Sequence, residues 1–336
     1  MQPTENPQMH NYPLSKLFLI PLLLCLSFLT HADNTYSNIY IFGDSLSDTG
    51  NLGSVIGGIP APYYENRISN GPVGVETLTA KFGYTADASL HLLGLNAGNN
   101  YAVAGAKAST NEAIDLNTQI LSFQANHASI APKDALYVIY IGGNDVRAAL
   151  FEADPTISNS IIKTANKNVK NAIIMLKRMG ARSFLVINVP DIGLIPETRL
   201  IAIATNNPDY INHATELTIK YNKTLHHMID DLEEDNEHEH TFKIKEFSLF
   251  KLFGMIVEKS IYLGFTNNSE ACFRSRIPDF HPDCNYGLNA DQFIFFDEIH
   301  PTKRVHTMFG EAFIKAISNN KKKKKEKEKE KDKNHH

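Results

Sequence analysis

Cysteine is scarce in this chain of 336 residues, which contains three. One of them, Cys25, lies in an apolar N-terminal segment directly after Leu24, a context that fits poorly with a lipoprotein cleavage site. Beyond that segment only Cys272 and Cys284 remain, and a structural zinc site would need two further spaced ligands. In an exported chain, two cysteines that close a short loop favour a disulfide over two free thiols. We therefore predict a bond between Cys272 and Cys284 and no metal site on these cysteines.

The N-terminal segment also lacks a hydrophobic run long enough to span a membrane. Lys16 precedes an apolar run over residues 17–29, and these 13 or so residues are short against the roughly 20 that a spanning helix needs. The run ends in Thr30, His31 and Ala32, with small residues at the two positions that a signal peptidase reads. This pattern predicts a signal peptide over residues 1–32 and an exported protein, periplasmic or secreted. An uncleaved membrane anchor is the alternative.

Most of the chain has no surplus of positive charge. The net charge is −4, yet residues 321–333 hold nine lysines against four acidic residues, while residues 1–32 are neutral. The rest of the chain therefore carries about −9, which argues against a nucleic-acid groove as the main function. Residues 319–336 have no apolar side chains to bury, which predicts a disordered tail. Attraction of its lysines to anionic lipid is a minor alternative role.

Alternating strand and helix patterns fill the remainder of the chain. Segments rich in β-branched and aromatic residues predict buried strands over residues 38–42, 135–141, 183–189 and 241–247. Helical periodicity predicts helices over residues 73–82, 115–126, 161–179, 212–235 and 302–318. Strand followed by helix, repeated, predicts a mainly parallel sheet with helices on both faces, a three-layer α/β/α sandwich. We see no repeat of fixed period and expect one domain over residues 33–318.

A serine directly follows the first predicted strand. In an open parallel sheet, ligands bind beyond the carboxyl ends of the strands, so chemistry is expected there. Ser45 lies in the turn Gly-Asp-Ser-Leu-Ser-Asp at residues 43–48, where it is either a nucleophile or a helix N-cap. Asp44 and Asp48 of the same turn are expected to shape it rather than to transfer protons.

A carboxylate and an imidazole lie near the other end of the chain. Asp297 precedes His300 by three residues in the sequence Asp-Glu-Ile-His-Pro. This spacing allows the carboxylate to meet one ring nitrogen while the other nitrogen faces outward. A single Asp-x-x-His pattern is also compatible with a structural role.

Two glycine-containing turns offer hydrogen-bond donors. Asn144 follows the second predicted strand in Gly-Gly-Asn-Asp at residues 142–145, where its amide could donate to a developing oxyanion. Gly105 would allow the backbone to come close to a ligand and to offer its N–H group. The alternatives are an ordinary Gly-Asn turn and a plain tight turn.

Together these four stretches resemble, in the same order, the blocks of the GDSL or SGNH hydrolase family: Gly-Asp-Ser-Leu, a glycine, Gly-x-Asn-Asp and Asp-x-x-His. Further stretches that resemble the family lie at residues 67–72, 115–119, 188–193 and 262–267, so the resemblance covers about residues 37–318. It implies the SGNH hydrolase fold, a flavodoxin-like arrangement.

By position, the resemblance implies that Ser45 is the nucleophile, that His300 is its general base and then acid, and that Asp297 orients the imidazole. It also implies an oxyanion hole formed by the N–H groups of Ser45 and Gly105 and by the Asn144 side chain. The implied reaction is acyl transfer through an acyl-serine, which requires no metal or organic cofactor. Histidines at residues 238, 240, 335 and 336 could bind a metal, but solvated histidines are the better interpretation.

The long first block and the export signal resemble the bacterial lipolytic branch that includes lysophospholipases and glycerophospholipid:cholesterol acyltransferases. The resemblance implies a lysophospholipase or phospholipase A acting on lysophospholipid or phospholipid, with acyl transfer to an alcohol such as a sterol as a companion activity. A carbohydrate deacetylase or short-chain carboxylesterase is the alternative, and a non-catalytic secreted binding protein is a remote one.

Two segments bear on lipid binding. Residues 247–257 are apolar over most of a helix circumference, which indicates either buried core or contact with an acyl chain or membrane surface. The loop between Cys272 and Cys284 carries bulky apolar and basic side chains. We hypothesise that this loop borders the active site and modulates access, with an activating protease as a partner; a staple for a long loop is the alternative.

Overall fold

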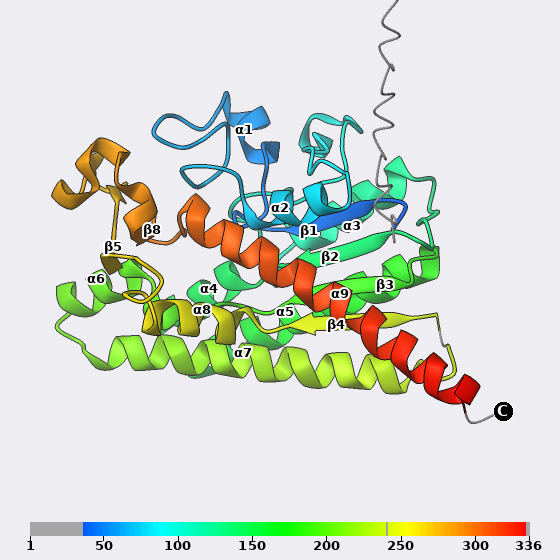
Figure 1. The fold of residues 1–336 in the computed structure, drawn as a ribbon. Helices are drawn as coiled ribbons and strands as arrows, with labels where there is room; N and C mark the ends of the chain where they lie inside the picture. Colours follow the sequence, from blue (N-terminus) through cyan, green and yellow to red (C-terminus); the bar gives the residue numbers. More distant parts are fainter. Residues whose placement is uncertain (1–35, 240, 334–336) are drawn as a thin grey trace, which may run out of the picture. The chain divides into compact units, whose positions relative to one another are not determined.

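Four parallel strands form the central sheet of the protein (Figure 1). The structure is a computed structural model that describes residues 36–239 and 241–333, with side chains as far as Ser318. The strands are paired in chain order: β1 (Ile39–Gly43), β2 (Leu136–Tyr140), β3 (Ser183–Ile187) and β4 (Lys243–Phe247). β-branched and aromatic side chains dominate β1 and β2, and every residue of both is buried. The predicted strands and their parallel arrangement are confirmed.

Residues 99–103 extend the sheet beyond β1. The N–H of Ile41 donates to the Asn99 carbonyl at 3.0 Å, and the N–H of Tyr101 donates to the Ile41 carbonyl at 2.7 Å. The N–H of Val103 donates in turn to the Gly43 carbonyl at 3.1 Å. This irregular segment therefore covers the edge of β1 that β2 leaves open and brings the following residues to the carboxyl end of β1.

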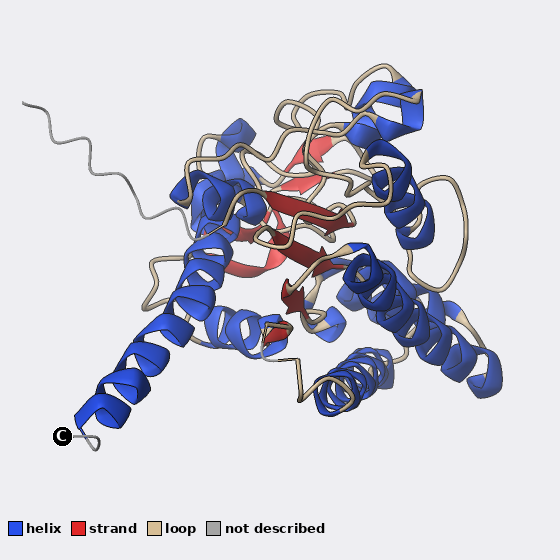
Figure 2. Ribbon diagram, turned by 90° about the vertical axis from the view of Figure 1, so that its right-hand side faces the viewer, coloured by secondary structure: helices blue, strands red, loops and turns tan. Residues whose placement is uncertain are grey.

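Helices cover both faces of the sheet, as predicted (Figure 2). The helices of the described residues are α1 (Asn51–Ile56), α2 (Gly74–Lys81), α3 (Leu116–Asn126), α4 (Gly143–Phe151), α5 (Pro155–Met179), α6 (Pro196–Ala204), α7 (Asp209–Glu234), α8 (Leu249–Glu258) and α9 (Lys303–Lys333). Helix α2 packs against α9, which crosses in front of the sheet in Figure 1, while α5 lies behind the sheet in contact with α3 and α7. The sequence did not predict α1, α4 and α6, and it indicated α8 only as an apolar segment; α1, with 6 residues, offers too few turns for a clear periodicity.

The last helix extends beyond its predicted end. The sequence predicts a helix up to residue 318 and a disordered tail over residues 319–336, whereas α9 continues to Lys333. Lysine and glutamate, which alternate over much of this stretch, are strong helix formers. A sequence without apolar residues therefore does not exclude a helical backbone.

The segment of chain that follows α8 and precedes α9 forms a second, smaller hydrophobic core. There β5 (Asn267–Ala271) pairs in parallel with β8 (Phe293–Phe295), and β6 (Phe273–Arg274) pairs in antiparallel fashion with β7 (Asp279–Phe280). Cys272 and Cys284 form a disulfide with their Cα atoms 5.3 Å apart. We call the buried residues around this bond the disulfide core: Cys272, Phe273, Cys284, Ala290, Phe293 and Phe296.

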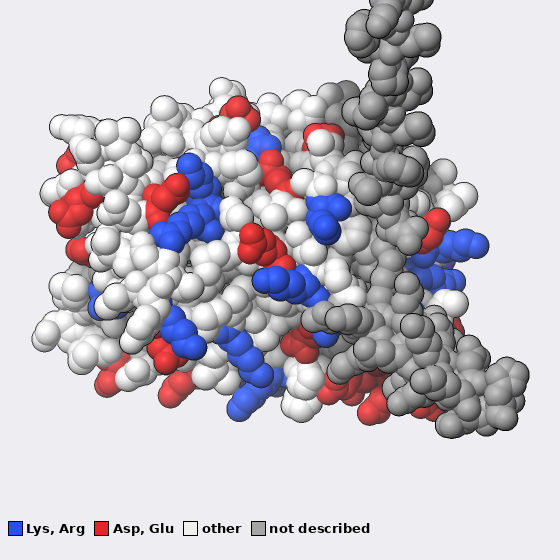
Figure 3. Space-filling model, viewed as in Figure 1, with Lys and Arg blue, Asp and Glu red and all other residues white. Residues whose placement is uncertain are grey.

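Charges of both signs are interspersed on the face of the protein shown in Figure 3, without a continuous basic patch. Within the described part of the chain, no helix has both the length and the hydropathy that a membrane crossing needs. The predicted signal peptide lies outside the described residues, as do His240, His335 and His336.

A substitution of Gly142, which lies between β2 and α4, would show how tightly the carboxyl end of β2 is packed. Its φ is +124°, and an added Cβ would lie 2.3 Å from the hydroxyl oxygen of the fully buried Tyr221. We expect Gly142→Ala to lower the free energy of unfolding by about 2–4 kcal/mol, from backbone strain plus overpacking, in chemical denaturation. Gly57→Ala is the matched control, because its φ is +81° but no atom lies within 4 Å of the added Cβ. Its expected cost is about 1 kcal/mol, and equal losses in the two variants would contradict the packing argument.

Candidate active site

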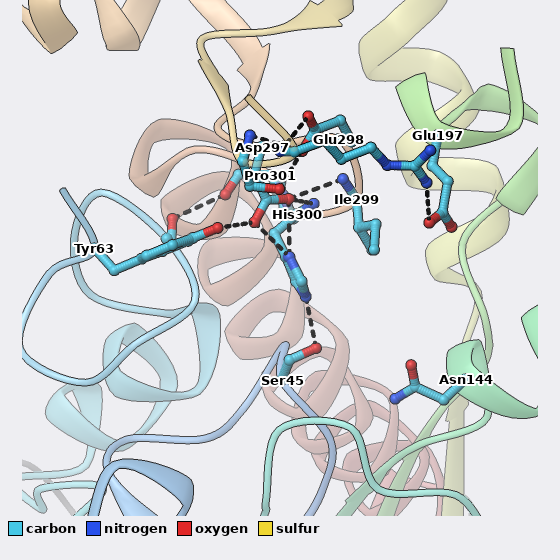
Figure 4. A network of polar contacts seen from close by, with 12 residues as sticks. Ser45, Tyr63, Asn144, Glu197, Asp297, Glu298, Ile299, His300 and Pro301 are labelled. Atoms are coloured by element: carbon cyan, nitrogen blue, oxygen red, sulfur yellow. Dashed lines mark hydrogen bonds and ion pairs between the residues drawn. The ribbon is translucent and has the colours of Figure 1, made fainter. Parts of the chain in front are cut away.

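Ser45 and His300 meet above the carboxyl end of β1 (Figure 4). Ser45 lies two residues after β1, and its side-chain oxygen Oγ is 2.8 Å from Nε2 of His300. His300 lies in the loop that connects β8 to α9. The structure therefore brings together the predicted hydroxyl and imidazole, which are 255 residues apart in sequence.

Asp297 holds the other side of the imidazole. Both carboxylate oxygens lie 2.9 Å from Nδ1 of His300, and Oδ1 also accepts the backbone N–H groups of Ile299 at 2.8 Å and His300 at 2.7 Å. Burial raises the pKa of Asp297, but the charge of His300 and these hydrogen bonds outweigh burial and hold the pKa below its ordinary value. Asp297 is therefore a buried carboxylate anion that can fix the orientation of the ring.

Hydrogen bonds within the loop that carries His300, and from this loop to residues 69 and 70, hold its conformation. The N–H of Phe296 donates to the His300 carbonyl at 2.8 Å, and the Ser69 hydroxyl donates to the Pro301 carbonyl at 2.8 Å. The Asn70 side chain accepts the N–H of Lys303, the first residue of α9, at 2.8 Å. The stretch at residues 67–72, one of those that resemble the family, thus supports the candidate histidine.

Asn144 faces the same cavity as Ser45 and His300. Its amide nitrogen donates to the Ala106 carbonyl at 3.0 Å, which leaves one amide hydrogen for a ligand. Gly105, directly before Ala106, has a φ of +86° but is not among the residues that line the cavity. Among the described residues, nothing accepts a hydrogen bond from the backbone N–H of Ser45 or Gly105. The Ser45 N–H and the Asn144 amide are thus available as donors on residues that line the cavity, while the Gly105 N–H is free among the described residues but belongs to a residue outside the lining.

Buried carboxylates hold the loops that carry these donors. Asp48 accepts the N–H groups of Gly50 at 2.8 Å and Asn51 at 2.7 Å, and its second oxygen accepts the N–H of Ala104 at 2.8 Å. Asp145 accepts the N–H of Ser109 at 2.7 Å. Because each carboxylate binds backbone N–H groups on another segment, the motif aspartates fix the shape of the site.

Asp44 differs from these aspartates because it lines the cavity itself. Burial raises its pKa to about 7, and the N–H of Leu46, which it accepts at 3.1 Å, opposes that effect. The hydrogen bond from Leu46 shows that Asp44 stabilises the turn around Ser45.

An ion-pair network that the sequence did not predict surrounds Asn144. Arg147 donates to the Asn144 side-chain oxygen at 3.2 Å and forms an ion pair with Glu197 at 2.7 Å. Glu197 also pairs with Arg276 of the disulfide-bonded loop at 2.9 Å. Glu298, next to Asp297, accepts the Ser275 hydroxyl of that loop at 2.5 Å. The loop between the cysteines therefore touches the segments that carry the candidate catalytic residues.

No local pattern in the sequence could have revealed this network, because its members lie in different elements. Tyr63 was missed for the same reason: its hydroxyl donates to Oδ2 of Asp297 at 2.8 Å across 234 residues of sequence. Glu298 was visible only as the neighbour of Asp297.

The cavity is lined by both polar and apolar residues. The polar ones are Asp44, Ser45, Asn144, Arg147 and His300, and the apolar ones include Pro190, Ile192, Ile195, Phe253, Ile299 and Phe309. Phe253 belongs to α8, whose residues Leu249, Phe253 and Ile256 are buried. The apolar segment at residues 247–257 is therefore largely core, with one aromatic side chain that faces the cavity.

This arrangement has the parts that acyl transfer needs. A hydroxyl contacts a base, a buried carboxylate orients that base, and several N–H donors lie nearby for an oxyanion. Among the residues that the structure describes, no group of three His, Cys, Asp or Glu side chains could hold a metal ion.

Comparison with known proteins identifies one family. Residues 39–313 match the model of the GDSL-like Lipase/Acylhydrolase family. Over 182 residues the chain is 33% identical to "Lipase 1" of Photorhabdus luminescens, a match that covers 52% of this chain but only 25% of that protein. It is 26% identical to "Phosphatidylcholine-sterol acyltransferase" of Aeromonas hydrophila, with 82% of this chain and 88% of that protein covered. An acetylxylan esterase structure from Geobacillus stearothermophilus aligns with a TM-score of 0.41 at 10% identity, over 83% of this chain and 93% of that one.

A fluorophosphonate probe, which modifies activated serine hydroxyls, tests the geometry without a substrate. We expect the probe to label Ser45 in the wild-type protein and, because His300 must accept the proton, to label His300→Ala at least about 100-fold more slowly. Peptide mass mapping identifies the labelled residue. Ser47→Ala is the control, since Ser47 is buried and makes no contact with His300. Equal labelling of the wild-type protein and His300→Ala would exclude an activated serine at this position.

Proposed function

This chain belongs to the GDSL-like lipase/acylhydrolase family and is a carboxylic ester hydrolase. We propose that it cleaves acyl esters of phospholipids and lysophospholipids through an acyl intermediate on Ser45. The observation that carries the proposal is the pair of hydrogen bonds that connect Ser45 to His300 and His300 to Asp297, next to a cavity with a largely apolar lining.

In the first half of the proposed reaction, Oγ of Ser45 attacks the ester carbonyl while Nε2 of His300 takes the hydroxyl proton. Asp297 stabilises the imidazolium that forms. The carbonyl oxygen becomes an oxyanion that accepts hydrogen bonds from the N–H groups of Ser45 and Gly105 and from the Asn144 amide. The bond to the leaving alcohol then breaks, and His300 returns the proton to that alcohol.

In the second half, a water molecule attacks the acyl-Ser45 ester while His300 takes its proton. The fatty acid leaves, and Ser45 regains a proton from His300. An alcohol such as a sterol can replace water in this step, because only the acceptor differs. Hydrolysis and acyl transfer are therefore two outcomes of one intermediate.

The apolar wall of the cavity supports a fatty acyl substrate. Ile192, Ile195 and Phe253 present hydrocarbon to the space beside Ser45, and burying an acyl chain against them gains about 0.8 kcal/mol per methylene group. The phosphatidylcholine-sterol acyltransferase relative, matched over most of both chains, is named for a phospholipid donor and a sterol acceptor. This supports the lipid substrate class and keeps acyl transfer as a companion activity.

We further propose that the protein is exported and that it makes peripheral contact with a membrane surface beside the cavity. Ile277 is 61% exposed within the disulfide-bonded loop, and Tyr286 and Leu288, just past it, are 83% and 81% exposed. Arg276 ties the loop to Glu197 near the cavity. These apolar side chains are suitably placed to enter a lipid surface, and the loop remains our candidate site for an activating protease.

Product analysis with lysophosphatidylcholine, diacylphosphatidylcholine and a sterol supplied together tests the function. We expect fatty acid release, and any sterol ester formed must also depend on Ser45. Ser45→Ala should lower turnover by about 10⁴-fold with an unchanged melting temperature, because only the nucleophile is lost.

The dependence on acyl length distinguishes the substrate classes. The proposal predicts faster cleavage of long-chain than of acetyl esters, because a longer acyl chain buries more methylene groups against the apolar lining and is bound more tightly. Faster cleavage of acetylated carbohydrate would instead favour the deacetylase alternative. Unchanged lipid hydrolysis by Ser45→Ala would contradict the mechanism itself.

A further inference from the structure

Tyr63 extends the series of hydrogen bonds from Ser45 through His300 and Asp297 by one further residue. Its hydroxyl donates to Oδ2 of Asp297 at 2.8 Å, whereas the backbone N–H groups of Ile299 and His300 occupy Oδ1 (Figure 4). Tyr63 lies outside every stretch that resembles the family. The carboxylate that orients His300 thus depends on a side chain from a distant loop between α1 and α2.

The disulfide core holds the ring of Tyr63 in place. Its ring meets Phe296 edge-on with centroids 5.4 Å apart and an interplanar angle of 82°, and it meets Phe273 at 5.9 Å and 89°. Phe273 follows Cys272 of the disulfide directly. Two perpendicular contacts leave the ring little freedom to turn, so its hydroxyl is directed at Asp297.

Toward Asp297 the Tyr63 hydroxyl acts as the donor, and the Ser275 side chain is a further hydrogen-bond partner of this hydroxyl. Burial raises the pKa of Tyr63, and the negative charge of Asp297 raises it further, because a phenolate beside a carboxylate would be repelled. The proton therefore stays on the phenol throughout the pH range in which Asp297 is ionised. Asp297 is only 3% exposed, so bulk water has little access to replace this donor.

We propose that Tyr63 is a positioning residue that acts on His300 through Asp297 and extends the activity of the enzyme to lower pH. This inference rests on the proposed function of the same site. By accepting a hydrogen bond from the phenol, Oδ2 shares part of its negative charge and attracts the imidazolium less strongly. His300 consequently gives up its proton more readily and is available as a base at lower pH.

Other charged and titratable groups lie around Tyr63, Asp297 and His300. They are Asp44 in the turn after β1, which Arg147 of α4 influences, Glu298 in the His300 loop and His306 in α9. Burial lowers the pKa of His306 to about 3, so it adds no charge near neutral pH. Tyr63→Phe keeps every one of these side chains, and Ser275, which contacts both the Tyr63 hydroxyl and Glu298, is the group through which the change could reach Glu298.

Tyr63→Phe is the direct test, because it keeps both ring contacts and removes only the donor. In the pH profile of kcat/KM for ester hydrolysis, we expect the acid limb to move to higher pH by about half a unit or more. The plateau should fall by about 3- to 10-fold as Asp297 loses one of its constraints. The matched control is Tyr64→Phe, whose exposed ring makes no contact with the triad. Its profile should equal that of the wild type.

Two further measurements separate positioning from folding. The proton resonance of His300 Nδ1 should move downfield in Tyr63→Phe, because the carboxylate binds this hydrogen more strongly. Replacing Tyr63 with 3-fluorotyrosine, a stronger donor, should move the acid limb to lower pH. An acid limb and resonance that stay in place in a folded Tyr63→Phe protein would overturn the inference. Ser45→Ala tests the proposed function separately, so loss of that function would not be mistaken for failure of this inference.

Discussion

The hydrogen bond between Ser45 and His300 is the contact on which the proposed chemistry depends. It joins residues 255 positions apart and requires the end of β1 and the loop before α9 to meet above one sheet edge. The parallel sheet directs the carboxyl ends of its four strands to the same side, which explains why Ser45 and Asn144 meet there. His300 reaches this side from the loop after β8, which lies outside that sheet. Ser69, Asn70 and Phe296 then hold the His300 loop and the start of α9 through hydrogen bonds to their backbone. Several residues in the stretches that resemble the family therefore position backbone.

Buried carboxylates give the site its rigidity. A carboxylate taken out of water costs several kcal/mol unless hydrogen bonds replace its hydration. Asp48 and Asp145 meet this requirement with backbone N–H groups, and Asp297 with two backbone N–H groups, one imidazole and the Tyr63 hydroxyl. Each carboxylate can be satisfied in only one arrangement of the surrounding loops. The cost of burial is thus offset only when the donors around Ser45 are in place.

Much of this organisation could be predicted from the sequence, since β1, β2 and β3 are largely apolar runs and Ser45, Asn144 and His300 each lie in a recognisable motif. The chain does place these three side chains on one cavity. Tyr63 and Glu197 could not be predicted, because their partners are distant in sequence and nothing local marks them. Helix α1 offered too few turns, and the C-terminal lysines gave no apolar pattern from which the extension of α9 could be inferred.

The most direct test of the account is to find where the acyl group rests during turnover. The protein is mixed with phosphatidylcholine, quenched in acid within one turnover and digested, and the peptides are examined by mass spectrometry. The account predicts one fatty acyl group on the peptide that contains Ser45, and none on that peptide from His300→Ala quenched at the same time. An acyl group on another residue, or substrate turnover with no acylated peptide at any quench time, would contradict it.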